Sequence, residues 1–183
     1  MRRLLRFAVR AIVVIPLASG CAATISAGAH VDRTVDFARY RTFDWGPADA
    51  FPTGDPRLDR DPDFQDHVLG AVERGLAARG MTLSAPGTSD LLVHYHANVT
   101  ERFDADRFHR VYGYCGAAGC PPEPVRYEAG TLVVDVIDSR THTLVWRGWA
   151  RTGVDELLRD SRAMAKTIDR AVDEMMQQMP RGR

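Results

Sequence analysis

The chain has 183 residues, of which 45% are hydrophobic and 26% are charged. This length and composition are typical of one globular domain, and they exclude a chain that is disordered over most of its length. Lys plus Arg and Asp plus Glu each number 24, so the formal charge is zero. A broad nucleic-acid interface requires a clear basic excess, and we therefore expect no nucleic-acid partner.

The first twenty residues have the layout of a secretory signal peptide. Residues 1–10 contain four arginines, residues 11–18 (AIVVIPLA) are almost wholly apolar, and a small Ser-Gly pair precedes Cys21. A membrane-spanning helix needs about 20 apolar residues, whereas this run is shorter and contains Pro16. We therefore expect residues 1–20 to be a signal peptide that is cleaved off. The remaining 163 residues carry a formal charge of −4, because four bases leave with the signal peptide.

The residues around the expected cleavage point, Ala-Ser-Gly-Cys at 18–21, resemble the lipobox of bacterial lipoproteins. The resemblance implies cleavage before Cys21, a diacylglycerol on its sulfur and a further acyl chain, such as palmitate, on its amino group. Several acyl chains anchor a protein stably, since each buried CH₂ contributes about 0.8 kcal/mol. Ala22 stands where Asp commonly retains lipoproteins at the inner membrane, which implies an outer-membrane lipoprotein facing the periplasm. The alternative is a secreted protein in which Cys21 is unmodified.

Three segments follow from this interpretation: the signal peptide, then Cys21 with a small, polar tether over residues 21–29, and a single α+β domain over residues 30–183. The membrane is the expected partner through the lipid anchor. An envelope protein or a cell-wall component, whose identity the sequence does not give, is the second expected partner. We expect no cofactor.

The other two cysteines, Cys115 and Cys120, lie in a turn rich in Gly and Pro. An extracytoplasmic location is oxidising, and such a turn can bring two Cα atoms within bridging range, so we predict a disulfide between them. A zinc site is the alternative, but it needs two more ligands, and His109 alone is near in sequence.

The first predicted elements are extended. Residues 31–37 alternate apolar with polar side chains, which predicts a strand, and residues 40–45 (YRTFDW) continue the extended pattern. Residues 46–60 are rich in Pro, Gly and Asp and predict a long surface loop.

A helix is predicted from about Pro62 to Arg79, with Asp61 as its N-cap and Gly80 as its stop. Apolar residues recur along it at helical spacing. Two glycines inside it, at positions 70 and 75, each cost about 1 kcal/mol unless they permit close packing against a sheet.

The second half of the chain predicts a strand over residues 90–100 and a hairpin of residues 129–138 with 144–150. A long amphipathic helix starts near Asp155 and ends before Pro180, with Met176 at its surface. These elements predict an α+β fold, an antiparallel sheet of about five strands with two helices packed on one face.

Three blocks of sequence resemble a family of bacterial lipoproteins named the domain of unknown function DUF4136. The blocks are residues 40–45 (YRTFDW), residues 89–95 (SDLLVHY), and residues 130–138 (GTLVVDVID) with 144–148 (LVWRG). The resemblance implies a small α+β envelope domain without an assigned activity. The loop that carries the two paired cysteines matches no pattern of the family.

Two histidines, His94 and His96, lie two residues apart on a predicted strand and so share one face. With His109 they form a candidate metal site, and a metal-dependent hydrolase is the alternative function that such a site indicates. The competing interpretation is that both are solvent-facing polar residues.

No nucleophile, Walker or metalloprotease motif occurs, and we therefore expect a non-enzymatic accessory or binding module. A ligand pocket between the sheet and the helices is a third hypothesis.

The hairpin contains two carboxylates on opposite faces, Asp135 and Asp138, which makes them poor candidates for a catalytic pair. Asp135 requires a partner if its strand is central, and we expect a structural ion pair with Arg147 on the next strand. The tryptophans at positions 45, 146 and 149 are expected to pack in the core.

Overall fold

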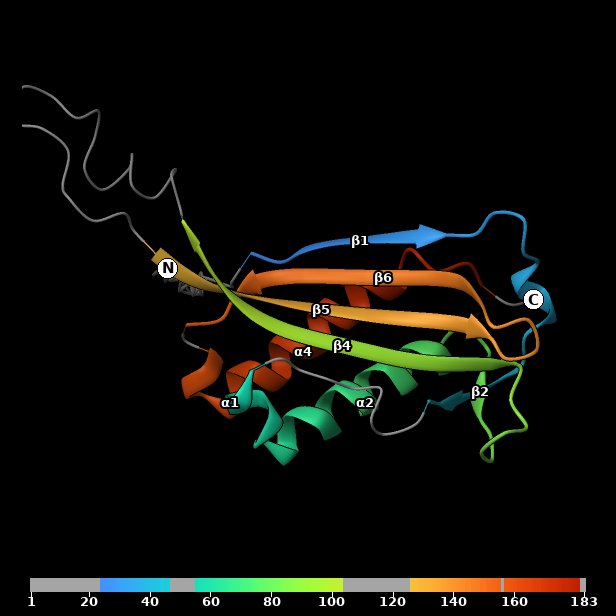
Figure 1. The fold of residues 1–183 in the computed structure, drawn as a ribbon, viewed down its shortest axis with the longest axis horizontal. Coiled ribbons are helices and arrows are strands. Elements are labelled where there is room, and N and C mark those ends of the chain that lie inside the picture. The colour runs from blue at the N-terminus through green and yellow to red at the C-terminus, as the bar shows by residue number, and fades with distance from the viewer. Residues whose placement is uncertain (1–23, 47–54, 104–125, 156, 182–183) are drawn as a thin grey trace, which may run out of the picture.

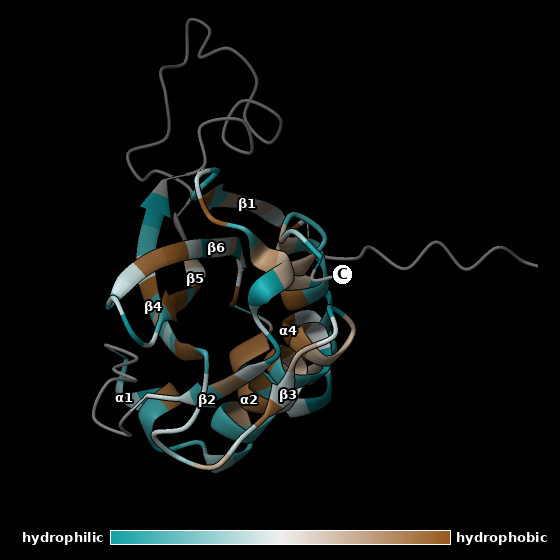
Figure 2. Ribbon diagram, turned by 90° about the vertical axis from the view of Figure 1, so that its right-hand side faces the viewer, coloured by the Kyte–Doolittle hydropathy of each residue, from teal (hydrophilic) through white to brown (hydrophobic). Residues whose placement is uncertain are grey.

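The computed structural model describes residues 24–46, 55–103, 126–155 and 157–181. Its strands form one six-stranded sheet, and its two long helices lie together on the same side of that sheet (Figures 1 and 2). The strands are β1 (Ser26–Val31), β2 (Thr42–Trp45), β3 (Thr82–Leu83), β4 (Leu91–Phe103), β5 (Arg126–Asp138) and β6 (Thr143–Gly153). The helices are η1 (Phe37–Arg39), α1 (Pro56–Asp59), α2 (Pro62–Ala77), η3 (Leu157–Arg159) and α4 (Ser161–Met176).

The strand order is β1-β6-β5-β4-β2-β3, and the sheet is mixed. The pairs β1/β6, β6/β5 and β5/β4 are antiparallel, whereas β2 runs parallel to both β4 and β3. The prediction of an α+β fold is therefore confirmed, but the prediction of a wholly antiparallel sheet of about five strands is wrong. The physical reason is α2, which carries the chain across the sheet between β2 and β4 and so returns it in the same direction.

The core lies between the sheet and the two long helices, where the hydrophobic segments of both layers face each other (Figure 2). Alternate residues of β4 point into it, because successive side chains of a strand point to opposite faces. The largest fully buried side chains include Trp146, Tyr40, Tyr95, Phe43, Leu76, Met81, Leu91 and Met175.

Aspartate caps fix the starts of both long helices. Asp61 accepts hydrogen bonds from the backbone N–H groups of Asp63 (3.0 Å) and Phe64 (3.2 Å), as its predicted N-cap role requires. Asp160 accepts equivalent bonds at the start of α4. The predicted start near Asp155 is therefore too early, because the short η3 turn comes first.

The N-terminal predictions need two corrections. β1 already begins at Ser26, inside the segment expected to be tether, and it pairs with β6 over six residues. The strand predicted over residues 31–37 is wrong after Val31. There the Asp32 carboxylate accepts a hydrogen bond from the Thr34 N–H (2.9 Å), and Asp36 caps η1. Aspartate side chains stabilise turns in this way, and the alternating polarity therefore imitated a strand.

The glycines of α2 give a direct test of its packing. A Cβ on Gly75 would lie 2.7 Å from Cγ of Met176, whereas a Cβ on Gly70 would meet only the guanidinium end of exposed Arg74, at 3.2 Å. Gly75 thus permits close packing against a helix rather than the expected sheet. Met176, expected at the surface, is 3% exposed.

We expect Gly75→Ala to destabilise the protein by about 1 to 3 kcal/mol through overpacking of the two helices. We expect Gly70→Ala to stabilise it by up to about 1 kcal/mol, because alanine favours the helix. Urea unfolding of both variants measures these changes. Equal effects of the two substitutions would contradict the close contact at Gly75.

Candidate functional site

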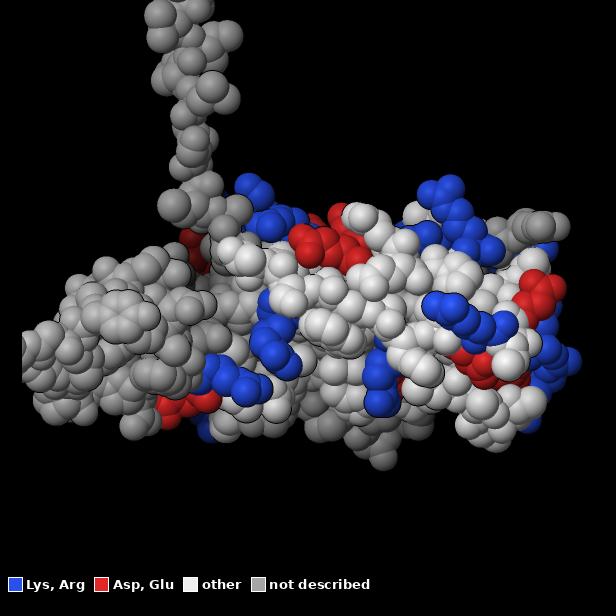
Figure 3. All heavy atoms as spheres, turned by 90° about the horizontal axis from the view of Figure 1, so that it is seen from above, with Lys and Arg blue, Asp and Glu red and all other residues white. Residues whose placement is uncertain are grey.

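The sheet has one face that none of the described helices covers, and we call it the helix-free face. Its central side chains come from alternate positions of β1, β6, β5 and β4. They are His30, Arg147, Trp149, Arg151, Asp135, Val133, His94 and His96. Seen from the β1 side, basic and acidic groups are interspersed rather than gathered in one patch of a single sign (Figure 3). This arrangement suits local polar contacts rather than a broad attraction for one charged polymer.

The centre of this face is an ion pair between neighbouring strands. Arg147 donates from Nε to Oδ1 of Asp135 and from Nη2 to Oδ2, both at 2.6 Å. The structure therefore places together the two residues that the sequence analysis paired. Asp135 is 5% exposed, whereas the side chain of Arg147 that binds it is about half exposed. Both carboxylate oxygens are engaged in this fork, and the hydrogen bond to Asp135 raises the pKa of Arg147.

His94 lies directly opposite Asp135 in the β4/β5 register. Its ring sits against Gly46, where a Cβ would lie 2.4 Å from Nε2. Burial lowers the pKa of His94, the charge of His96 adds to this, and the attraction of Asp135 opposes it. The ring is therefore neutral at neutral pH, and Arg147 provides the positive charge that Asp135 needs.

The candidate metal ligands are divided between two parts of the chain. His94 and His96 share the helix-free face of β4, as their spacing predicts. His109 lies outside the described residues, as do Cys21, Cys115 and Cys120. Within the described ranges, no group of three or more His, Cys, Asp or Glu side chains could hold a metal ion. The disulfide and the lipidation site stay predictions.

Trp149 departs from the expectation that all three tryptophans lie in the core. Trp146 is fully buried, but Trp149 is 37% exposed on the helix-free face. Its ring lies over Gly28 of β1, where a Cβ would be 2.4 Å from Cζ2. On β6 it stands between Arg147 and Arg151. Tryptophan and arginine are the residue types most enriched in the energetic centres of protein interfaces.

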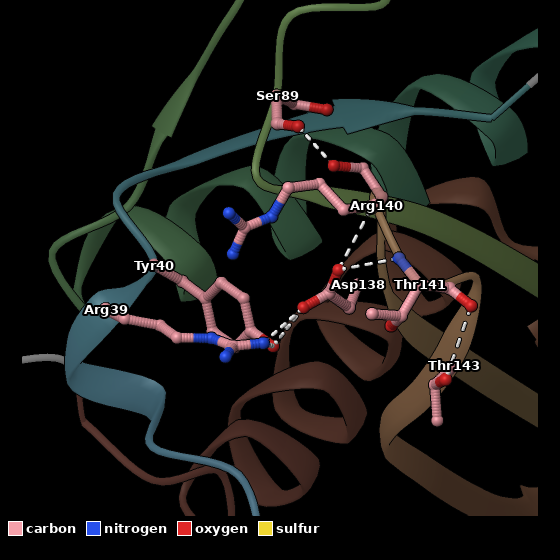
Figure 4. Close-up of polar contacts among 8 residues, drawn as sticks. Arg39, Tyr40, Ser89, Asp138, Arg140, Thr141 and Thr143 are labelled. Atoms are coloured by element: carbon pink, nitrogen blue, oxygen red, sulfur yellow. Dashed lines mark hydrogen bonds and ion pairs between the residues drawn. The ribbon is translucent and has the colours of Figure 1, made fainter.

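A second polar cluster lies at the far end of β5, around Asp138 (Figure 4). The side chain of Asp138 has no exposed surface. It accepts hydrogen bonds from the Tyr40 hydroxyl (2.9 Å), from the backbone N–H groups of Arg140 (3.0 Å) and Thr141 (3.1 Å), and from Arg39. Burial alone would raise the pKa of Asp138, but these hydrogen bonds outweigh it and lower the pKa to about 2.

The sequence does not predict this cluster. Strand alternation places Asp138 on the face opposite Asp135 but indicates no partner for it. A carboxylate at the end of a β-branched strand signals the need for a donor, and Tyr40 in the YRTFDW block is such a donor. Nothing in the sequence indicates that the two come together, because they are 98 residues apart.

Asp90, in the SDLLVHY block just before β4, has a similar role. The Asp90 carboxylate accepts hydrogen bonds from the backbone N–H groups of Arg41 (2.8 Å) and Thr42 (3.1 Å). In return the Thr42 hydroxyl accepts from the Asp90 N–H (3.0 Å). The hydrogen bond from Arg41 is the main reason that the pKa of Asp90 is lowered. The polar residues of these family blocks thus connect β2 to β4 and to the end of β5.

The pKa of Asp138 predicts how stability depends on pH. A carboxyl group with a lowered folded-state pKa stabilises the fold fully above its unfolded-state pKa, near 3.8, and loses that effect as the pH falls toward 2. We expect Asp138→Asn to lower the free energy of unfolding by about 2 to 4 kcal/mol at pH 7. We also expect the variant to lose less stability than the unchanged protein as the pH falls from 4 to 2. Urea unfolding across this pH range measures both effects.

The control for this test is Asp169→Asn, which removes a half-exposed carboxylate that pairs with Arg74. We expect this surface substitution to change stability by less than about 1 kcal/mol. If the stability of Asp138→Asn falls between pH 4 and pH 2 as steeply as that of the unchanged protein, the lowered pKa of Asp138 is refuted.

The comparison with curated proteins gives no match. Among solved structures, a DUF4136 family protein from Bacteroides thetaiotaomicron is similar, with 16% identity, a TM-score of 0.53, and coverage of 86% of this chain and 95% of that one. A PDZ domain protein from Parabacteroides distasonis is 16% identical with a TM-score of 0.51 over 88% of this chain. This chain spans 37% of the length of that protein.

A PelC dodecamer from Paraburkholderia phytofirmans is also similar, at 10% identity and a TM-score of 0.49, with coverage of 87% of this chain and 100% of that one. None of the described helices has the length and apolar character needed to cross a membrane. The family model named domain of unknown function DUF4136 matches residues 28–181. The chain therefore belongs to the DUF4136 family.

Proposed function

We propose that this protein is a lipid-anchored accessory domain of the cell envelope, which binds a partner and performs no catalysis. The single observation that carries the proposal is the short distance along the chain between Cys21 and the folded domain. β1 begins at Ser26. Five residue steps span at most about 17 Å, so an acylated Cys21 would hold the sheet close to the membrane surface. Ala22, in place of an inner-membrane retention Asp, supports a location at the outer membrane, with the domain on the periplasmic side.

The contacts of the buried carboxylates support a role without catalysis. The oxygens of Asp135 are held by Arg147, and those of Asp138 by Tyr40, Arg39 and two backbone N–H groups. A general acid or base must be able to reach a proton on a substrate. These groups are instead oriented toward partners within the fold.

The helix-free face is the binding surface in this proposal. Trp149 offers a large, partly exposed ring, and Arg147 and Arg151 on either side of it are donors for polar contacts. An aromatic anchor with flanking arginines suits a protein or peptide partner in the envelope.

The competing function is a metal-dependent hydrolase that uses His94, His96 and His109. Its support is the shared face of the first two histidines and the neutral state of His94, since a metal binds the neutral imidazole. Metal analysis of full-length protein purified without a chelator separates the two functions. Stoichiometric zinc, copper or iron that is lost in His94→Ala would favour the hydrolase.

We expect Cys21→Ser to prevent acylation and processing at this position, because serine lacks the sulfur that carries the diacylglycerol. Intact-mass analysis of envelope material reports the acyl chains on the unchanged protein and their absence from the variant. Extraction with carbonate or high salt then tests anchoring. If the unchanged protein carries no acyl group, the lipid-anchor proposal is wrong.

We expect Trp149→Ala to reduce recovery of a cross-linked envelope partner about fivefold or more, which corresponds to a loss of at least about 1 kcal/mol. The matched control is Leu83→Ala, which removes the other large exposed hydrophobic side chain of the described residues, 53% exposed on β3. Cross-linking is done in intact cells at native expression, and thermal unfolding checks that both variants fold. Equal recovery with both variants would remove the helix-free face from the proposal.

A further inference from the structure

An apolar cavity of about 80 Å³ lies between the sheet and the helices. Its wall includes Phe64 of α2, Val99 of β4, Leu132 of β5, and Ile168 and Ala171 of α4. Most of the lining side chains are apolar, and the polar residues of the wall are Asn98, Thr131, Arg151, Thr152 and Thr167. A sugar or a peptide in such a space would leave its hydrogen-bonding groups unpaired, which is costly, so the cavity suits a hydrocarbon ligand.

The cavity lies toward the end of the sheet where β1 begins. Thr152 of β6 is part of its wall, and the Thr152 hydroxyl donates a hydrogen bond to the backbone carbonyl of Thr24 (3.3 Å). Gly130 and Ala150, near the start of β5 and the end of β6, line the same cavity. The segment that precedes β1 therefore starts at the rim of the cavity.

The distance from this rim to the expected anchor is short. Cys21 is three residues before Thr24, and three residues span at most about 11 Å. An acyl chain attached to Cys21 is flexible and long enough to fold back over such a distance.

We infer that the end of one acyl chain of the Cys21 anchor occupies this cavity. The inference rests on the proposed lipid anchor and extends it, because it gives one chain a place in the protein as well as in the bilayer. A cavity of about 150 Å³ lined by Leu, Ile and Phe holds benzene. The space here is about half of that and accommodates the terminal methylenes of a chain. In the cavity these methylenes are removed from water without a polar group being buried.

The test uses a photoactivatable fatty acid with a diazirine at its terminal carbon, which cells incorporate into lipoproteins. Full-length protein is irradiated in intact cells, purified and digested, and mass spectrometry locates the cross-links. We expect cross-links from the Cys21 acyl group to peptides of α4 and β5 in the unchanged protein. We expect Ala171→Leu, which fills the cavity, to reduce them at least fivefold.

The matched control is Ala71→Leu. Ala71 is 4% exposed on α2 and Ala171 is 6% exposed on α4, but only Ala171 lines the cavity. The control overpacks the core to a similar degree and should retain the cross-links. Thermal unfolding checks both variants. Ala97→Leu, which fills the cavity from β4, replaces Ala171→Leu if that variant does not fold.

Each outcome has one meaning. An acylated Cys21 whose label reacts with bilayer lipids alone overturns the inference but leaves the proposed anchor intact. Absence of the label from Cys21 refutes the anchor itself. Cross-links to α4 that persist in Cys21→Ser, from labelled membrane lipids, show that a free lipid is the occupant and also overturn the inference. Loss of the cross-links in Ala171→Leu, with their retention in Ala71→Leu, supports the inference that the acyl chain occupies the cavity.

Discussion

The buried carboxylate of Asp138 holds together segments that are far apart in the chain. Its partners Tyr40 and Arg39 come from about the first quarter of the sequence, 98 and 99 residues earlier. A carboxylate removed from water is strongly unfavourable unless it is paired and hydrogen-bonded. The fold therefore requires η1 to lie beside the β5/β6 turn. This contact fixes where β2 enters the sheet, and β2 then pairs parallel to β4.

The same reasoning explains the sequence blocks on which the resemblance to the family rests. Asp90 binds the backbone at the start of β2, and Trp45 at the other end of β2 donates to Glu73 of α2 (2.9 Å). These polar contacts fasten a short strand that pairs with β4 at only three positions. Their chemistry serves the architecture, so the family blocks describe how the domain folds. The surface proposed here for binding is instead the helix-free face, where Trp149 is 37% exposed.

The sequence predicts the elements whose signals are local. α2 follows from helical spacing with Asp61 as its cap, and the β5/β6 hairpin follows from β-branched runs around a short turn. Prediction from the sequence fails where an element's position depends on a partner that is distant in the chain. The parallel pairing of β2 with β4 depends on the crossover, and the exposure of Trp149 depends on which face the helices cover. Strand alternation alone does not distinguish these possibilities, because both faces of β6 contain large side chains.

The two ends of the sheet have different roles in this structure. Asp138 and its partners lie at the end remote from the start of β1, since the β1 register runs from Ser26 opposite Arg151 to Val31 opposite Trp146. The apolar cavity and Trp149 lie toward the opposite end, where the chain leaves for Cys21. If Cys21 carries the proposed anchor, a tether this short would limit how far the domain rotates away from the membrane. The proposed binding surface would then be close to the bilayer, whereas the contacts of Asp138 would be farthest from it.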